Sequence, residues 1–265
     1  MKIKFYIITY DNNPILNDWI LKSLNESDYD RKNVQVFVIN NHSNIEINDE
    51  YKSFVTVLNN NLRPDFSTGH LSRNHNQAII NGFRDLKNPD CDVVISCQND
   101  TILHKNWYQA LMEIMNRYTY VCIGRGDQFQ AFKSESIRNI GLYDERFCNI
   151  GFQEADFFLR SYLYNKDHSS INDYQHCRVH NPIDNQVILD TIHGGARGEI
   201  SHLKSYAYHP LSLNIFRAKW GDIHPENWNT DKRYTTITEC KLKNHIYYPY
   251  FEMDIIDLLG KNYII

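Results

Sequence analysis

The sequence lacks the marks of three broad classes of protein. It has no basic excess, since 28 Lys and Arg oppose 32 Asp and Glu and the net charge is -4. The electrostatic footprint of a nucleic-acid-binding protein is therefore missing. Its longest apolar runs, such as 34–39, fall far short of the roughly 20 residues of a membrane-spanning helix. The first ten residues, MKIKFYIITY, are not expected to form a signal peptide, because the apolar stretch is short and no small-residue cleavage site follows.

The cysteines also lack a pairing motif. Six are present, at positions 91, 97, 122, 148, 177 and 240, and none forms a CxxC pair, which argues against a zinc ribbon. Without an export signal they are expected to stay reduced. We therefore expect a cytoplasmic protein of ordinary globular composition.

Four short, β-branched apolar runs dominate the first hundred residues. They cover residues 3–9, 34–39, 54–58 and 92–97. Their apolar residues are continuous and do not alternate strictly, which is typical of strands buried on both faces. Helical patterns at 14–24, 72–86 and 106–118 separate several of them. The order β-α-β-β-α-β-α predicts an α/β fold with a doubly wound, mostly parallel sheet. A further amphipathic helix is expected around 151–164, and long loops beyond about residue 165, ending in a helix near 254–261.

Polar residues follow three of the predicted strands. They are residues 11–13, 40–44 and the triplet Gln98, Asn99 and Asp100. Ligands of such sheets bind beyond the carboxyl ends of the strands, so these tips are expected to share one crevice. A carboxylate there suits a hard divalent cation, and the two amides suit a sugar or ribose. The alternative is a plain turn, because Asn-Asp is a common turn pair.

Three further segments carry chemistry and have structural alternatives. In GFQEADFFLR, Glu154 or Asp156 could act as a general base, or Asp156 could only pair with Arg160 one turn later. In STGHLSRNHNQAI, a helix start with Arg73 suits a diphosphate, or is simply a capped helix start with Ser72 as the N-cap. His180 and His193 are candidate metal or phosphate ligands, or loop residues.

Taken together, these segments resemble the GT-A glycosyltransferases of the large family 2 type. The resemblance rests on the order of IITYDNN, VFVINNHSN, GHLSRNHNQAI, the triplet QND, IGLYDERFCNIGFQEADFFLR, VHN and AKWG, and covers roughly residues 3 to 221. It implies a GT-A domain at 1–221, with a nucleotide-sugar half at 1–120 and an acceptor half at 121–221. Residues 222–265 would be an extension packed on the same domain.

The resemblance also implies a reaction and a role for each site residue. A nucleotide-diphosphate sugar, with UDP favoured, would donate its sugar by inversion to a glycan or lipid-linked glycan, in capsule or lipopolysaccharide synthesis. The chain would work in the cytoplasm, with peripheral association at the inner membrane face left open. The donor's base and ribose would lie near Thr9, Tyr10, Asp11, Asn40 and Asn41, and its diphosphate near Arg73 and the triplet. Asp100 would hold Mn²⁺ or Mg²⁺, with Glu154 as the base and Asp156 as its substitute.

Two departures from the family pattern concern the donor site. The triplet holds a single carboxylate, so part of the positive charge on the diphosphate would come from Arg73 or a histidine. Asn40 stands in the nucleobase loop where an aspartate is usual in the family, so the identity of the donor's nucleobase stays open.

Two other functions stay open. A sugar-1-phosphate nucleotidyltransferase shares the α/β scaffold, but its Gly-rich loop with Arg and Lys is missing from TYDNNP. A catalytically degenerate nucleotide- or glycan-binding protein would keep the fold without the reaction. The retained Glu154, Asp156 and Arg160 argue against it.

Overall fold

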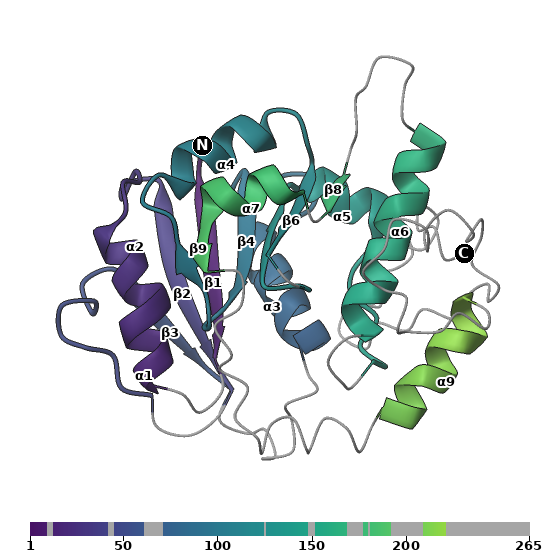
Figure 1. Cartoon of the computed structure of the whole chain (residues 1–265), viewed down its shortest axis with the longest axis horizontal. Helices are drawn as coiled ribbons and strands as arrows, with labels where there is room; N and C mark the ends of the chain where they lie inside the picture. Colours follow the sequence, from purple (N-terminus) through teal and green to yellow (C-terminus); the bar gives the residue numbers. More distant parts are fainter. Residues whose placement is uncertain are drawn as a thin grey trace.

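The computed structural model describes residues 1–9, 13–41, 45–60, 71–124, 126–147, 152–168, 177–179, 181–191 and 209–220. A seven-stranded sheet in the order β3-β2-β1-β4-β7-β6-β8 forms its centre (Figure 1). The strands of this sheet are β1 (Ile3–Thr9), β2 (Val34–Asn40), β3 (Val55–Asn59), β4 (Val93–Gln98), β6 (Tyr120–Ile123), β7 (Phe129–Phe132) and β8 (Cys177–Val179).

The four strands predicted from the apolar runs lie side by side and parallel. β1 pairs with β2 on one side and with β4 on the other, and β2 pairs with β3. β7 runs antiparallel between β4 and β6, and β6 is parallel to β8. The prediction of a doubly wound, mostly parallel α/β sheet is confirmed.

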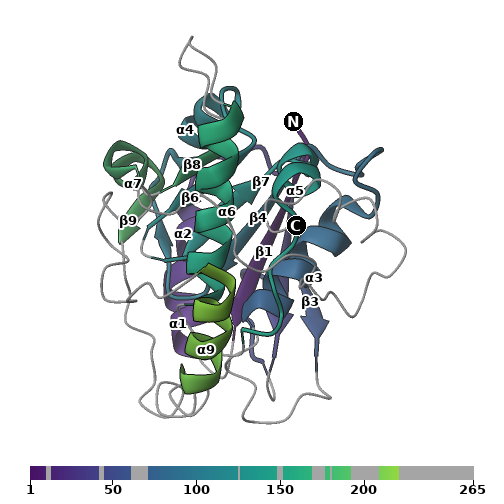
Figure 2. The ribbon, with the colours of Figure 1, turned by 90° about the vertical axis from the view of Figure 1, so that its right-hand side faces the viewer.

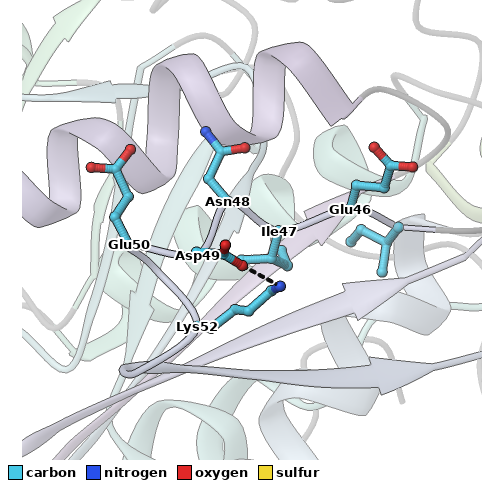
Figure 3. A pocket seen from close by; sticks show the side chains of 7 residues that line it. Glu46, Ile47, Asn48, Asp49, Glu50 and Lys52 are labelled. Atoms are coloured by element: carbon cyan, nitrogen blue, oxygen red, sulfur yellow. Dashed lines mark hydrogen bonds and ion pairs between the residues drawn. The ribbon is translucent and has the colours of Figure 1, made fainter.

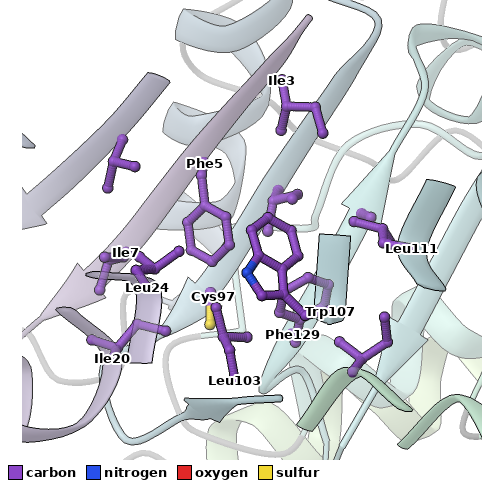
Figure 4. Packing of buried hydrophobic residues seen from close by; sticks show 14 of the residues in the cluster. Ile3, Phe5, Ile7, Ile20, Leu24, Cys97, Leu103, Trp107, Leu111 and Phe129 are labelled. Carbon is purple, nitrogen blue, oxygen red and sulfur yellow. The ribbon is translucent and has the colours of Figure 1, made fainter. Parts of the chain in front are cut away.

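Helices cover both faces of the sheet. On one face lie α1 (Asn13–Ile15), the π-helix η1 (Leu16–Leu21), α2 (Lys22–Glu26), α4 (Trp107–Met115) and α7 (Pro182–Ile188). Because side chains alternate along a strand, Phe5 of β1 points to this face and meets Trp107 with ring centroids 5.5 Å apart (Figure 4). The indole N–H of Trp107 donates to Ser27 Oγ at 3.0 Å, so this large buried side chain keeps its polar atom bonded.

The opposite face carries α3 (Leu71–Phe83), α5 (Ser134–Ile140) and α6 (Phe152–His168). Tyr6 and Ile8, the alternate residues of β1, belong to this core. A third cluster joins α6 to α9 (His209–Trp220) through Phe152, Phe216 and Trp220. In Figure 2, α9 lies at the lower end of α6, which it contacts.

Beyond residue 165, where the sequence predicted loops, the described residues include short elements. They are β8, α7, α9 and β9 (Leu189–Thr191), which pairs with β5 (Ile102–Leu103). α7 starts because Asn181 caps it, accepting hydrogen bonds from the N–H groups of Ile183 and Asp184, and Pro182 suits a first turn. The helix predicted near 254–261 and the extension 222–265 lie outside the described residues. Within the described ranges, no helix is long and apolar enough to span a membrane.

Candidate functional site

Amide side chains line the carboxyl ends of the parallel strands. At the end of β1, the Thr9 hydroxyl accepts a hydrogen bond from Asn99 Nδ2 at 2.9 Å. At the end of β2, Asn40 Nδ2 donates to Asn59 Oδ1 at 2.9 Å. Asn41 Nδ2 donates to the Thr9 carbonyl at 3.3 Å. Hydrogen bonds among these Asn and Thr residues therefore join the predicted strand ends into one edge.

The turn between β6 and β7 reaches the same edge. β7 is antiparallel to both β4 and β6, so β6 runs in the direction of β4 and ends at the same side of the sheet. The main-chain N–H of Gln98 donates to the main-chain carbonyl of Gln128 at 2.9 Å. The side-chain Nε2 of Gln128 donates to the main-chain carbonyl of Asp100 at 3.4 Å. The turn thus lies directly against the triplet.

Asp127 in this turn divides its two carboxylate oxygens between two parts of the fold. Oδ1 accepts a short hydrogen bond from Gln98 Nε2 of the triplet. Oδ2 accepts one from Gln153 Nε2 in the first turn of α6, at 3.2 Å. The same oxygen lies 2.8 Å from His75 Nε2 of α3. One carboxylate, only 1% exposed, therefore connects β4, α3 and α6.

His75 completes this buried group. Its side chain is fully buried, and its Nδ1 lies 2.8 Å from Ser96 Oγ of β4. Burial on its own would raise the pKa of the Asp127 carboxyl. The charge of His75 and hydrogen bonds from His75 and Gln153 outweigh that effect and hold the pKa below its ordinary value. Asp127 is therefore an ionised acceptor at neutral pH.

Glu154 approaches the turn from the first turn of α6. Gly126 has φ +62°, a conformation that favours glycine, and a Cβ there would lie 2.7 Å from Glu154 Oε2. The missing side chain at residue 126 lets the Glu154 carboxylate rest against the turn backbone. Unlike Asp127, Glu154 is partly exposed, and the helix N-terminus favours its ionised form.

Asp156, two residues further on, is fully buried and held by cations. Arg160 Nη2 lies 3.0 Å from Asp156 Oδ2, which is the i,i+4 pair that the sequence offered as an alternative. Lys219 Nζ forms an ion pair with the other oxygen, to which Trp220 Nε1 donates at 2.8 Å. Lys219 also pairs with Asp144 at 3.0 Å. These contacts attach α9 to α6 and turn Asp156 away from solvent.

Arg73 lies in the first turn of α3, near the same edge of the sheet. Its Nε is 3.3 Å from Glu145 Oε2, and its side chain is 33% exposed. Ser72 is inside this helix and donates to the Phe147 carbonyl at 3.5 Å, so the structure does not support Ser72 as the cap. A guanidinium that is one third exposed at this edge of the sheet is of the kind that binds phosphates.

Only some of the residues that the sequence predicted to bind metal or nucleotide lie in the described part of the chain. Tyr10, Asp11, His180 and His193 lie outside the described residues. Among the residues that are described, no three His, Cys, Asp or Glu side chains gather into a metal site. Asp100, 6% exposed at the end of β4, supplies one carboxylate. Mg²⁺ is commonly bound by one or two carboxylates together with substrate phosphates and waters, so this donor set fits a cation that arrives with a diphosphate.

Sequence reasoning missed Asp127, His75 and Gln153. The signal for Asp127 was present, since GRGD follows the apolar run YVCI, a polar tip like those on the other strands. His75 and Gln153 carry no comparable local signal. Their polar atoms find Asp127 only when α3, β4 and α6 pack together.

A surface hollow elsewhere does not involve these residues. It is lined by residues 45–50 and 52, in the connection between β2 and β3 (Figure 3). Asp49 and Lys52 pair within it at 2.5 Å. Asn17 of η1 fixes this connection, donating to the Glu46 carbonyl at 2.8 Å and accepting from the Asn48 N–H at 3.0 Å. None of the predicted site residues lines the hollow.

Comparison with protein-family models and with curated proteins finds no match. Similar solved structures include the mannosyltransferase PcManGT from Pyrobaculum calidifontis in complex with GDP-Man and Mn²⁺, 12% identical with a TM-score of 0.47. That match covers 81% of this chain and 63% of the other. TarS of S. aureus is 11% identical with a TM-score of 0.49, covering 86% of this chain and 41% of TarS. The chain thus spans less than two thirds of either protein.

Proposed function

We propose that the protein is an inverting glycosyltransferase of the GT-A type that uses a nucleotide-diphosphate sugar. One observation carries the proposal: the polar strand ends and Glu154 meet at a single edge of the sheet, on either side of the β6–β7 turn. The amides of Asn40, Asn41 and Asn99 suit the uncharged ribose and base. Asp100 and Arg73 suit a metal-bound diphosphate. The sequence resemblance supports the same assignment.

The reaction requires a base on the acceptor side. Glu154 would accept the proton of an acceptor hydroxyl as its oxygen bonds to the anomeric carbon of the sugar. The bond from that carbon to the diphosphate oxygen breaks, and the nucleoside diphosphate leaves with the bonding electrons. A bound divalent cation would supply positive charge to the leaving diphosphate. Glu154 suits the base role better than Asp156, because Asp156 is enclosed by Arg160, Lys219 and Trp220.

The acceptor and setting follow from the resemblance alone. A glycan or lipid-linked glycan would receive the sugar, in synthesis of capsule or lipopolysaccharide at the inner face of the membrane. A degenerate binding protein is the alternative. It would bind nucleotide but catalyse no transfer.

Calorimetry with UDP and with GDP, each with and without Mn²⁺, tests the donor site. We expect Mn²⁺ to tighten binding of one nucleotide roughly tenfold, or about 1.4 kcal/mol, and Asp100→Ala to abolish this gain. Asp92→Ala is the matched control, because Asp92 is an exposed carboxylate just before the opposite end of β4. If neither nucleotide binds, the glycosyltransferase proposal fails. If the nucleotide affinity of every variant is the same with and without Mn²⁺, the metal role of Asp100 fails and the donor site is independent of cations.

A further inference from the structure

The β6–β7 turn contains the ionised carboxylate of Asp127, which has no part in donor binding or in proton transfer under the proposed function. Asp127 is 1% exposed, so it does not contact a bulky ligand directly. Enclosing a charge at such depth is costly unless it is paired and hydrogen-bonded. Here His75 supplies the pairing, and Gln98 and Gln153 supply further donors.

The two glutamines bind different oxygens of the Asp127 carboxylate. Oδ1 holds Gln98, which immediately precedes Asn99 and Asp100 at the end of β4. Oδ2 holds Gln153, which immediately precedes Glu154 at the start of α6. A shift of the triplet therefore moves one oxygen of a rigid planar group whose other oxygen anchors the first turn of α6.

His75 fixes the plane of that group. Its ring lies between Ser96 and Asp127, with 2.8 Å contacts on both nitrogens, and stacks on Tyr143 with centroids 4.8 Å apart. Ser96 belongs to the central strand β4, so the anchor of the carboxylate is the sheet itself. His75 therefore ties the carboxylate to the sheet, while Gln98 and Gln153 donate to its two different oxygens.

We infer that Asp127 is a positioning residue that links donor occupancy at the strand-end triplet to the placement of Glu154. The inference rests on the proposed function for what the two sides bind. In a ligand-free protein Asp127 orders the first turn of α6. When a nucleotide diphosphate engages the triplet, Gln98 transmits that contact through Asp127 to Gln153.

Hydrogen exchange on the full chain tests the link, with UDP and GDP as the probes. In the wild-type protein, saturating nucleotide should slow exchange in the triplet, in the turn 126–128 and in the first turn of α6, by roughly fivefold or more. In Asp127→Asn, one carboxylate oxygen becomes an NH₂ group. At saturation the triplet should still be protected, while protection of α6 falls to less than half.

Gln153→Ala cuts the same link from the other side and leaves the buried charge paired with His75. Protection should then reach the turn 126–128 but stop before α6. Asp184→Asn is the matched control, because Asp184 of α7 is a buried aspartate (2% exposed) that pairs with Arg178 of β8. It should transmit protection as the wild type does. Full protection of α6 in both Asp127→Asn and Gln153→Ala would overturn the inference.

The ligand-free proteins keep this inference testable if the proposed function is wrong. Should neither UDP nor GDP bind the wild type, the donor assignment fails, and basal exchange decides the positioning role. Asp127→Asn and Gln153→Ala should then exchange faster than wild type in the first turn of α6, and Asp184→Asn should not. Unchanged exchange in both test variants would refute an ordering role for Asp127.

Discussion

At Glu154, basicity can be removed while size is kept. We expect Glu154→Gln to lower sugar transfer by roughly two to four orders of magnitude, the usual range for a lost general base. Donor affinity and thermal midpoint should stay near wild type, because Glu154 is partly exposed and, in the proposed mechanism, meets the acceptor and not the donor. Transfer is measured with a nucleotide sugar and acceptor that support wild-type turnover.

Asp156→Asn provides the contrast at the neighbouring carboxylate. Removing its charge leaves Arg160 and Lys219 buried with less compensation, and breaking a buried pair typically costs about 3–5 kcal/mol. We therefore expect lower stability, with activity per folded molecule reduced less than in Glu154→Gln. If Glu154→Gln stays active and Asp156→Asn is inactive while folded, the base has been assigned to the wrong residue.

Among the elements, α3 lies on β4 at Gly82. A Cβ at this position would lie 2.2 Å from Val94 Cγ2, much closer than van der Waals contact allows. The approach matters for the site, because the same helix carries His75 to Ser96 of β4. The absence of a side chain at residue 82 thus helps to set how closely α3 approaches the sheet.

Gly82→Ala should therefore destabilise the protein by about 1–3 kcal/mol, the usual cost of overpacking. Asn81→Ala is the control, since Asn81 is the preceding, exposed residue of the same helix, and its change should stay within about 0.5 kcal/mol. Urea unfolding of both variants measures the difference. Equal stability of the two variants would mean that Val94 and the helix adjust without cost.

At the scale of the whole molecule, two buried carboxylates make stability sensitive to acid. Burial would raise the pKa of Asp144, but Lys219 and Arg146 overcome it and hold the pKa below its ordinary 3.8. The pKa of Asp127 is also held below 3.8. A carboxyl with a lower pKa in the folded state binds protons more readily once unfolded, so its stabilising contribution is present above about pH 4 and is lost as pH falls further.

We expect the urea midpoint to fall steeply once the pH drops below about 4. Asp144→Asn should be less stable at neutral pH and should show a shallower fall in acid, since it has no carboxyl to protonate at that position. Asp92→Ala, which changes an exposed carboxylate, should reproduce the wild-type slope. Parallel curves for wild type and Asp144→Asn would show that Asp144 is not a source of the acid sensitivity.

The amino-acid sequence by itself determined the four parallel strands β1 to β4 of the sheet and the location of their polar ends. Short β-branched apolar runs such as 34–39 and 92–97 are typical of strands covered on both faces. Their parallel order then brings Thr9, Asn41 and Gln98 to one edge. These are local patterns, legible within a few residues, and the structure shows β1 to β4 at the predicted places.

Only the tertiary structure decided which of these carboxylates are buried and which one stays partly exposed. Asp127 meets His75 across 52 positions of the chain and Gln98 across 29, and Asp156 meets Trp220 across 64. The residue pattern left both Glu154 and Asp156 as candidate bases, the family resemblance preferred Glu154, and Asp127 was passed over. Burial and ion pairing depend on packing between distant elements, and no local pattern encodes them. Packing leaves Glu154 partly exposed beside Gly126, encloses Asp156 among cations, and places Asp127 between the two halves of the site.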